Sequence, residues 1–441
     1  RRQTHPVHHA FDEEICMSTS THAPFVAHAA PRSSRKALQL ISRLPHGQLR
    51  LVLPTGQTVH MGQNQGPCAS LRIHDWEVFD MTMASGDIGF AQAYRKGLWE
   101  TPDLTALLRL VLINRRHLED LIHGHWLGNL LNRVHHWMRR NTKANSKRNI
   151  QAHYDLGNAF YQLWLDETMM YSAASFEGKL DRPLAQAQQL KIERVLAQAG
   201  VTPGSRVLEI GCGWGGLAEV AVRDHGAQVT GLTLSPAQLA YANERLQSKG
   251  LSADLRLQDY RDTHDAPFDA VCSIEMFEAV GQAYWPAYFK AVHEALRPGG
   301  RACIQTITID DALFDRYIRG TDFIQQFIFP GGCLPSPSEF RKHAQAAGLR
   351  VVDEFSLRLD YAETLRRWQS TFMAKQGQVL GMGFDETFIR TWQFYLAYCE
   401  AGFRAGLAAA CPRQAIHAAN AAPPRPIAWP RAWRSCWRKE I

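Results

Sequence analysis

No stretch of this 441-residue chain reaches the ~18 uninterrupted apolar residues that a membrane-spanning helix requires. The nine cysteines include no C-x-x-C pair, so a structural zinc site is disfavoured and no metal is expected. Several of these cysteines lie inside apolar runs, which favours buried, reduced thiols and a cytoplasmic setting. These absences predict a globular protein that is free in solution or bound to a membrane surface.

Positive charge is in modest excess, with 49 Lys and Arg against 42 Asp and Glu, but it is unevenly placed. Residues 133–148 carry many Lys and Arg and no carboxylate, within a segment (126–150) that we expect to be a basic linker helix. This patch is either a solvated linker face or a surface for an anionic partner such as lipid headgroups or nucleic acid.

Both ends of the chain lack a periodic apolar pattern. Residues 1–35 are rich in His, Ser, Thr, Pro and Ala, and residues 406–441 mix Pro, Trp and Arg, so both segments are predicted to be disordered. Residues 36–125 predict a small α+β domain, because a stretch of alternating apolar and polar residues around a Pro-Thr-Gly turn (47–62) is typical of a hairpin and residues 104–122 have helical spacing of Leu and Ile. No cluster of acid, base or nucleophile occurs in this domain.

From 151 to 405 short apolar runs alternate with longer helical segments, which is typical of a doubly wound α/β sheet. The strand "RVLEI" (206–210) runs into the glycine turn "GCGWGG" (211–216) and then into an amphipathic helix. Glycines let the backbone approach a ligand closely, and the helix N-terminus offers free N–H groups. The pattern therefore predicts a nucleotide-type cradle.

The residues that follow the strands indicate which ligand this cradle holds. Glu209 ends the first strand, and "LTLS" (232–235) closes the second where a dinucleotide site would have an acidic ribose ligand. A ligand with a cationic amino-acid tail and no pyrophosphate fits better, and S-adenosylmethionine is such a ligand. Tyr260 is placed to lie on its adenine, and a helix that begins at Ser235 as N-cap directs Gln238 back toward the strand ends.

The fourth and fifth strands bring further polar residues to the same edge. The fourth, in "FDAVCSIEMFEAVG" (268–281), runs into a loop that holds Glu275 and Glu278, and the fifth carries Gln305. Active sites of open α/β sheets form at the carboxyl ends of strands. We therefore expect Glu278 and Gln305 in the crevice.

Seven stretches between residues 150 and 404 resemble the cyclopropane-fatty-acyl-phospholipid synthase family, which includes mycolic acid cyclopropane synthases and fatty-acid methyltransferases. They are "HYDLGNAFYQLWLDETMMYS" (153–172), "LEIGCGWGG" (208–216), "GLTLSPAQ" (231–238), "EMFEAVG" (275–281), "FIFPGGCLPS" (327–336), "YAETLRRW" (361–368) and "YCEAGFR" (398–404). Residues 45–115 also look like the amino-terminal lipid-binding-like domain of full-length bacterial members.

The resemblance implies a class I methyltransferase fold that moves the methyl of S-adenosylmethionine onto the cis double bond of an unsaturated acyl chain, usually on a phospholipid. It further implies a cytoplasmic enzyme, peripheral at the inner membrane surface through its basic linker and amino-terminal domain, with a homodimer as one possible assembly. An alkene is a poor nucleophile, and alignment with the reacting methyl in a dry pocket can supply roughly 7 to 11 kcal/mol.

Site residues also follow from the resemblance. Those expected at the cofactor are Tyr171, Ser172, Glu209, Gly211, Cys212, Gly213, Trp214, Gly215, Thr233, Leu234, Ser235, Gln238, Asp259, Tyr260 and Arg261. Glu278 and Tyr361 match residues that position a bicarbonate ion, and Cys399 matches a cysteine commonly given as the active-site residue. Residues 314–329 would roof the acyl tunnel, and the alternative is that they are plain core. The substrate contacts expected in this stretch are Phe314, Tyr317, Phe323 and Phe327.

Two positions depart from the family pattern. Ala173 stands where the synthases usually have Cys, and Gln305 stands where they usually have His, and both positions contact bicarbonate in the family. Three outcomes stay open: Glu278 and Tyr361 still hold the ion, a carboxylate acts directly, or the cation is quenched to give a methyl-branched or methylene product. A non-catalytic lipid or cofactor binder is the rival hypothesis. A nucleic-acid methyltransferase would need a base-flipping pocket with an N-P-P-Y-like motif, which the sequence lacks.

Overall fold

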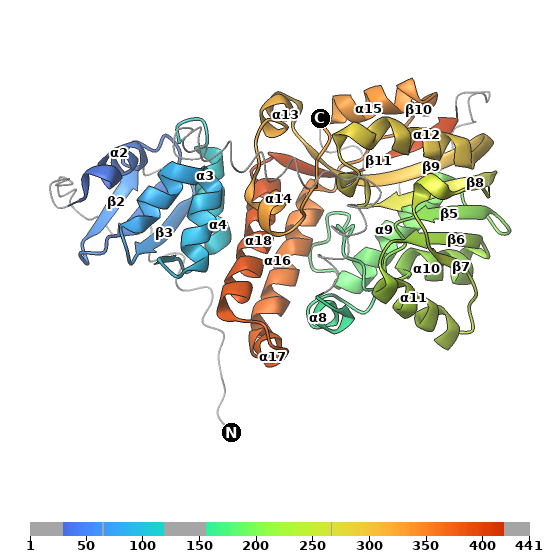
Figure 1. Ribbon diagram of the computed structural model, residues 1–441, viewed down its shortest axis with the longest axis horizontal. Coiled ribbons are helices and arrows are strands. Elements are labelled where there is room, and N and C mark those ends of the chain that lie inside the picture. Colours follow the sequence, from blue (N-terminus) through green and yellow to red (C-terminus); the bar gives the residue numbers. More distant parts are fainter. Residues whose placement is uncertain (1–29, 64–65, 119–155, 266, 419–441) are drawn as a thin grey trace.

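The computed structural model describes residues 30–63, 66–118, 156–265 and 267–418. The expected disorder of residues 1–29 and 419–441 and the expected linker helix at 126–150 lie outside this part of the chain. Figure 1 shows a small amino-terminal domain in blue and a larger sheet domain, with two long helices between them. Among the described helices, none has the length and apolar character needed to cross a membrane.

The amino-terminal domain is a four-stranded sheet with three helices. Its elements are α2 (Arg32–Ile41), β1 (Gln48–Val52), β2 (Thr58–Gly62), β3 (Cys68–Ile73), α3 (Glu77–Arg95), β4 (Trp99–Glu100) and α4 (Leu104–Ile113), with strand order β2-β1-β3-β4. The hairpin expected at 47–62 is confirmed, because β1 and β2 pair antiparallel. Helix α2 begins at Arg32, inside the segment predicted to be disordered up to residue 35.

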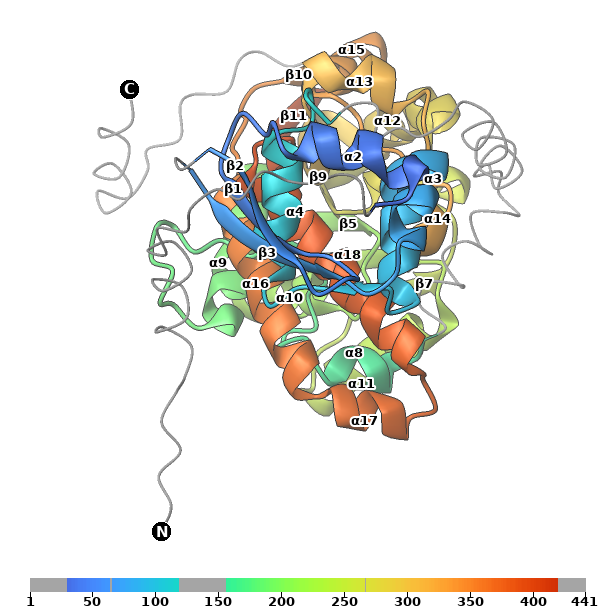
Figure 2. The same cartoon turned by 90° about the vertical axis from the view of Figure 1, so that its left-hand side faces the viewer.

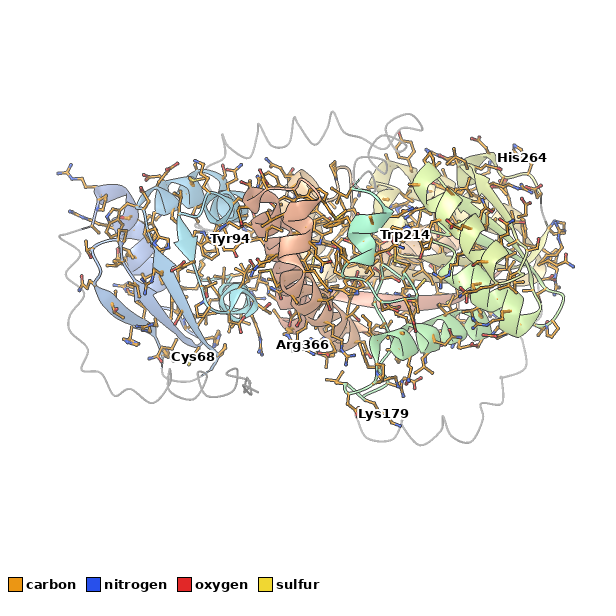
Figure 3. The ribbon with its side chains drawn as sticks, turned by 90° about the horizontal axis from the view of Figure 1, so that it is seen from below. Cys68, Tyr94, Lys179, Trp214, His264 and Arg366 are labelled. Atoms are coloured by element: carbon orange, nitrogen blue, oxygen red, sulfur yellow. The ribbon has the colours of Figure 1, made fainter. Side chains whose placement is uncertain are left out.

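Cysteine chemistry differs from the expectation at one described position. Cys68, on β3, is disulfide-bonded, so the prediction of reduced thiols is wrong for this residue (labelled in Figure 3). The described free cysteines are Cys212, Cys272, Cys303, Cys333 and Cys399.

The larger domain is built on a seven-stranded sheet with the order β10-β11-β9-β8-β5-β6-β7. The strands are β5 (Arg206–Ile210), β6 (Gln228–Thr233), β7 (Asp254–Leu257), β8 (Phe268–Ile274), β9 (Leu296–Ile309), β10 (Leu349–Val351) and β11 (Ala408–Ala418). β7, β6, β5, β8 and β9 pair in parallel, and β11 is antiparallel to both of its neighbours. The predicted α/β doubly wound class is confirmed.

Strand β11 overturns the prediction of disorder for residues 408–418 of the segment 406–441. Ala408–Ala418 fills the space between β9 and β10, and the register shifts between Pro412 and Ala415. Proline has no N–H to give to a ladder, which explains an irregularity there. The composition of this segment hid the strand because its pairing depends on β9, a partner about a hundred residues away in the sequence.

Helices cover both faces of the large sheet. Leu208 and Ile210 of β5 pack into a cluster with α12, whereas Val207, which points the other way, packs into a cluster with α9 and α10. The helices of this domain are α8 (Asn158–Gln162), α9 (Leu184–Ala199), α10 (Gly216–His225), α11 (Pro236–Ser248), α12 (Trp285–Ala295), α13 (Asp311–Tyr317), α14 (Phe323–Phe327), α15 (Pro337–Ala346), α16 (Arg358–Ala374), α17 (Gln376–Gly381) and α18 (Glu386–Arg404).

Helix α18 joins the two domains. Figure 2 shows α3 and α4 in front of it, and side chains link them directly. The Tyr94 hydroxyl donates to Gln393 Oε1 at 2.7 Å, and Arg95 Nε donates to Thr391 Oγ1 at 2.8 Å. The amino-terminal domain is thereby held against the helices that close one side of the active-site cavity.

Candidate active site

A cavity of about 840 Å³ lies at the carboxyl ends of β5, β6 and β8. β5 sits between β6 and β8, so the chain order reverses there, and ligands of open α/β sheets bind at such a reversal. The cavity also reaches Asp87 and Leu112 of the amino-terminal domain. Its volume falls in the range of about 300–1,000 Å³ that is usual for small-molecule sites.

The glycine turn after β5 has the backbone that the sequence required. Gly211, Gly213 and Gly215 all have positive φ, at 88°, 51° and 78°. A Cβ atom at Gly213 would meet nothing within 4 Å, so the backbone there faces open space. At Gly215 a Cβ would lie 3.0 Å from the Cβ of Ala242, so that glycine serves close packing of α10 on α11.

Most residues expected at the cofactor line this cavity. They are Tyr171, Ser172, Glu209, Gly211, Cys212, Gly213, Trp214, Thr233, Leu234, Gln238, Asp259, Tyr260 and Arg261. Gly215 and Ser235 are not in the cavity wall. They are the N-cap residues of α10 and α11, and the Ser235 side chain accepts a hydrogen bond from the Gln238 N–H as expected.

Glu209 carries the clearest sign of a cationic ligand. Its side chain is 3 % exposed, and its Oε2 has no hydrogen-bond partner among the residues that the structure describes. Burial raises the pKa of this carboxyl to about 8, while the charge of Lys191 lowers it. A ligand ammonium group would both satisfy the unpaired oxygen and favour its ionised form. The residues therefore fit S-adenosylmethionine.

The wall beside Tyr260 is fixed by an ion pair. Arg261 donates from Nε and Nη2 to the two oxygens of Asp259, at 2.8 and 2.6 Å. Tyr260 packs edge-on against Tyr288, with ring centroids 5.5 Å apart. At this wall the cavity therefore meets the Tyr260 ring and the Asp259–Arg261 ion pair, whose charges cancel.

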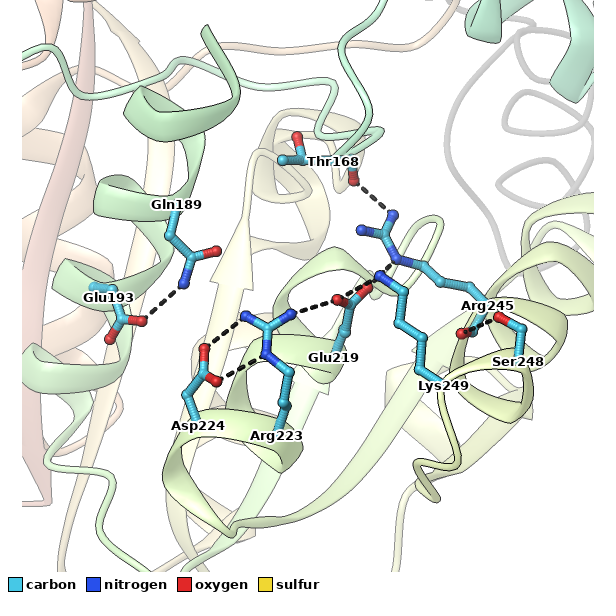
Figure 4. A network of polar contacts seen from close by, with 9 residues as sticks. All are labelled: Thr168, Gln189, Glu193, Glu219, Arg223, Asp224, Arg245, Ser248 and Lys249. Atoms are coloured by element: carbon cyan, nitrogen blue, oxygen red, sulfur yellow. Dashed lines mark hydrogen bonds and ion pairs between the residues drawn. The ribbon is translucent and has the colours of Figure 1, made fainter. Parts of the chain in front are cut away.

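A second polar network holds the loop that supplies Tyr171 and Ser172 (Figure 4). The buried Glu219 of α10 accepts hydrogen bonds from Arg223, Arg245 and Lys249. Arg245 also donates to the Thr168 carbonyl at 2.7 Å. One carboxylate thus ties α11 and residue 168 to the helix that follows the glycine turn. The indole of Trp214 adds a link to α8 by donating to Asn158 at 2.8 Å (Figure 3).

Glu275 occupies the centre of the predicted catalytic group. Its Oε1 accepts hydrogen bonds from the Ala173 N–H at 2.9 Å and from Gln305 Nε2 at 2.8 Å, and its Oε2 accepts one from the Tyr361 hydroxyl at 2.6 Å. Positions 173, 305 and 361 are three of the four positions that the family resemblance assigns to bicarbonate, and Glu278 is the fourth. In this chain, a carboxylate of the chain itself takes the donors at these three positions.

The backbone at Glu275 is in the left-handed region, with φ at 48°. A non-glycine residue pays roughly 1–2 kcal/mol for this conformation, and such strain is concentrated at functional sites. The three hydrogen bonds hold the side chain in place despite it. Glu275 lines the cavity, whereas Gln305 is fully buried behind it and acts on the cavity only through Glu275.

Glu278 lies beside Glu275 but has a different environment. The Ile307 N–H donates to its Oε1, and its Oε2 has no partner in the described part of the chain. Burial, followed by the nearby charge of Glu275, raises the pKa of Glu278 to about 8. Burial also raises the pKa of Glu275, but Tyr361, Ala173, Lys191 and Gln305 all oppose that rise. The three hydrogen-bond donors and Lys191 therefore favour the ionised form of Glu275, whereas burial and the charge of Glu275 favour the protonated form of Glu278.

The sequence analysis missed Lys191 of α9. This side chain is 1 % exposed, and its ammonium donates to Ser172 Oγ at 2.6 Å. Burial lowers its pKa to about 8, while the charges of Glu275, Asp166 and Glu209 oppose that change. The available signal was a lysine at helical spacing on the otherwise apolar face that carries Ala187 and Val195.

The other predicted catalytic residue, Cys399, lines the cavity as a thiol. Burial raises its pKa far above the ordinary value, and the nearby charges of Asp322 and Glu275 raise it further. Thiolate chemistry is therefore disfavoured at neutral pH. The side chain packs against the buried aromatic cluster of α16 and α18.

The aromatic stretch at 314–329 is only partly a cavity wall. Tyr317 lines the cavity as expected, but Phe314, Phe323 and Phe327 do not. Phe314 is buried against Trp285, and Phe323 packs on Phe327. Their side chains pack between helices, as in the core alternative, with Phe314 and Phe323 buried and Phe327 partly exposed, and substrate contact by these three residues stays a prediction. Phe329, the last residue of this stretch, and Tyr395 of α18 also line the cavity, although neither was among the expected substrate contacts.

Comparison with known proteins places this geometry in a family. A model of the mycolic acid cyclopropane synthetase family matches residues 141–411. The chain is 39% identical over 395 residues to the tuberculostearic acid methyltransferase UfaA1 of Mycobacterium tuberculosis, covering 87% of this chain and 90% of that protein. It is 33% identical over 347 residues to the cyclopropane-fatty-acyl-phospholipid synthase of Escherichia coli K12, covering 76% of this chain and 85% of that protein.

A solved structure agrees with these relatives. The mycolic acid cyclopropane synthase CmaA1 complexed with SAH and CTAB matches with a TM-score of 0.57 and 33% identity, over 61% of this chain and 97% of that chain. The strand order, the glycine turn and the unpaired Glu209 are consistent with this match. The chain is an S-adenosylmethionine-dependent methyltransferase and belongs to the mycolic acid cyclopropane synthetase family.

Proposed function

We propose that this enzyme methylates the cis double bond of an unsaturated phospholipid acyl chain, that Glu275 removes the proton, and that the product carries a methylene branch without ring closure. The observation that carries the proposal is the Glu275 carboxylate, held by Ala173, Gln305 and Tyr361 and facing the cavity. A base on the chain itself makes a bicarbonate ion unnecessary. Cyclopropane formation is the alternative outcome for the same methyl transfer.

S-adenosylmethionine, when bound, supplies an electrophilic methyl group. The residues proposed to hold it are Glu209 for its ammonium group, the turn at Gly211 and Gly213 for its amino-acid part, and Tyr260 for its adenine. Glu209 supports this role through its unpaired oxygen, and Gly213 through the open space that its backbone faces.

Methyl addition to one alkene carbon leaves the other carbon cationic, and one proton must then be lost. If the added methyl loses H⁺ while its C–H electron pair bonds to the cationic carbon, a cyclopropane forms. If a hydride first moves from the methylated carbon to its neighbour, loss of H⁺ from the methyl forms a methylene group instead. Either route needs a base beside the added methyl, and the ionised Glu275 meets that need.

One relative supports the open-chain product. UfaA1, which covers most of the chain, is named a methyltransferase rather than a synthase of rings. The cavity wall also suits a cation, because the aromatic faces of Tyr171, Phe329 and Tyr395 line it. The Escherichia coli relative, named for a phospholipid substrate, supports the lipid class. A phospholipid substrate in turn requires the enzyme to work at a membrane surface.

The test is incubation with labelled S-adenosylmethionine and vesicles of monounsaturated phospholipid, followed by mass spectrometry of the released fatty acids. Both candidate products gain one CH₂, so mild catalytic hydrogenation is needed to separate them. A methylene product takes up two hydrogens, whereas a ring survives unchanged. Hydrogenation-resistant product would replace the methylene proposal with ring formation. Absence of label in lipid despite tight cofactor binding would favour a non-catalytic binder.

A further inference from the structure

Three arginines line the cavity at residues that the methyl-transfer proposal does not use. Arg115 and Arg116 follow the end of α4 in the amino-terminal domain, and Arg316 lies on α13 of the sheet domain. Arg261 also lines the cavity and is ion-paired with Asp259. Two domains therefore contribute positive charge to one part of the same cavity.

Arg115 lies close enough to Arg116 and to Arg316 for like charges to act on one another. Partial burial and then the charge of Arg116 lower the pKa of Arg115, while Asp310 opposes this effect. Partial burial and then the charge of Arg115 lower the pKa of Arg316. Within the described residues, the side chains of Arg115 and Arg116 form no hydrogen bond or ion pair, and the Asp310 carboxylate accepts from the Ala312 N–H. An anion would relieve this repulsion.

Apolar residues that lie near these arginines in the chain also line the cavity. Leu112 precedes Arg115 by three residues and Leu313 precedes Arg316 by three residues, and both leucines line the cavity. Ile309 and Leu334 line it as well. A ligand that meets both sets of residues has an anionic head and a hydrocarbon chain.

We propose that Arg115, Arg116 and Arg316 bind the phosphate carried at the head of the acyl substrate, while its chain enters the apolar part of the cavity. This inference rests on the proposed function and adds where the head of the substrate is held. Guanidinium forks match phosphate oxygens in geometry and keep their charge at any physiological pH. The head site would fix how far the chain can enter, and therefore which double bond reaches Glu275.

The test compares Arg115→Gln, Arg116→Gln and the double variant with wild type. The assay uses non-ionic detergent micelles, so that the only anionic group comes from the substrate itself. The substrates are dioleoyl phosphatidylglycerol, oleoyl-coenzyme A and uncharged dioleoylglycerol. At ~1 kcal/mol per arginine, each single variant should raise KM about fivefold for a phosphate-bearing substrate and the double variant about thirtyfold, with kcat at saturation unchanged. KM for dioleoylglycerol should not change.

Arg319→Gln is the matched control. Arg319 lies just past the end of α13, is exposed, donates to the Asp315 carbonyl and does not line the cavity, so its variant should behave as wild type with every substrate. A KM effect with phosphatidylglycerol or with the coenzyme A ester identifies the source of the phosphate. Wild-type KM values in the double variant with both substrates would overturn the head site while leaving methyl transfer intact.

A binding measurement separates this inference from the proposed function. Titration calorimetry with dihexanoyl phosphatidate, which has no double bond to react, should show binding to wild type and to Arg319→Gln and at least tenfold weaker binding to the double variant. That result would support the head site even if no alkene were methylated. Equal binding to the double variant, or none to wild type, would refute it.

Discussion

Replacement of Glu275 by glutamine tests the centre of the proposed mechanism. The amide is close in size to the carboxylate, and its Oε1 can still accept from the Ala173 N–H and from Gln305. The variant should therefore fold and bind S-adenosylmethionine as wild type does. It has no basic oxygen to take a proton, and loss of a general base costs about 10²–10⁴ in rate. We expect kcat for lipid methylation to fall by that factor.

A companion variant, Glu275→Gly, sharpens the test. Glycine accepts the φ of 48° without strain and leaves the donors at positions 173, 305 and 361 free for a small anion. Added bicarbonate should then restore part of the activity of Glu275→Gly and none of that of Glu275→Gln, whose side chain fills the space. The assay is label transfer to lipid in bicarbonate-free buffer, with and without added ion, together with cofactor affinity by calorimetry. Wild-type kcat in Glu275→Gln would refute the role of Glu275 as base.

Three further results should follow from the buried charges and the glycine turn. Burial raises the pKa of Glu278 from 4.5 to about 8, so its neutral form contributes stability that is complete below pH 4.5 and is lost as pH rises through 8. Glutamine stays neutral at every pH. The melting temperature of Glu278→Gln, measured by scanning calorimetry, should therefore fall less than that of wild type between pH 4.5 and 8. Lys191→Met removes a charge that lowers the pKa of Glu275, so the acid limb of the kcat–pH profile should move to higher pH and Lys191→Arg should move it back; an unmoved limb would leave Lys191 a structural residue. Gly213→Val places a side chain in the open space before the turn, and calorimetry should show at least a tenfold loss of cofactor affinity, about 1.4 kcal/mol or more; the φ of 51° also strains the valine, so the melting temperature should fall as well.

Local signals in the sequence were enough for the cofactor half of the site. The glycine turn, Glu209 and the Ser235 cap depend on residues within a few positions of one another, so strand, turn and helix could be placed from spacing alone. The same reasoning failed where the outcome depends on distant partners. β11 is ordered by β9, and Phe314, Phe323 and Phe327 lie outside the cavity wall because they pack against the helices they meet. Lys191 was not predicted because its three carboxylate neighbours, Glu275, Asp166 and Glu209, are distant in the sequence, and nothing near a lysine on an apolar helical face indicates them.

The two departures from the family pattern, Ala173 and Gln305, have a single explanation once Glu275 is placed. At position 173 the contact that remains is the backbone N–H, which any side chain would supply, and the small buried methyl group leaves room for the glutamate. At position 305 the amide of Gln305 donates a hydrogen bond to the Glu275 carboxylate. Unlike a protonated histidine, it adds no buried charge that would have to be solvated. An enzyme that had lost its chemistry would have no reason to keep a strained, buried and ionised carboxylate, because that arrangement costs stability. Residues 173, 275 and 305 are therefore best understood as one coupled change that moves the base from a diffusible ion to the chain, and this argues for retained catalysis.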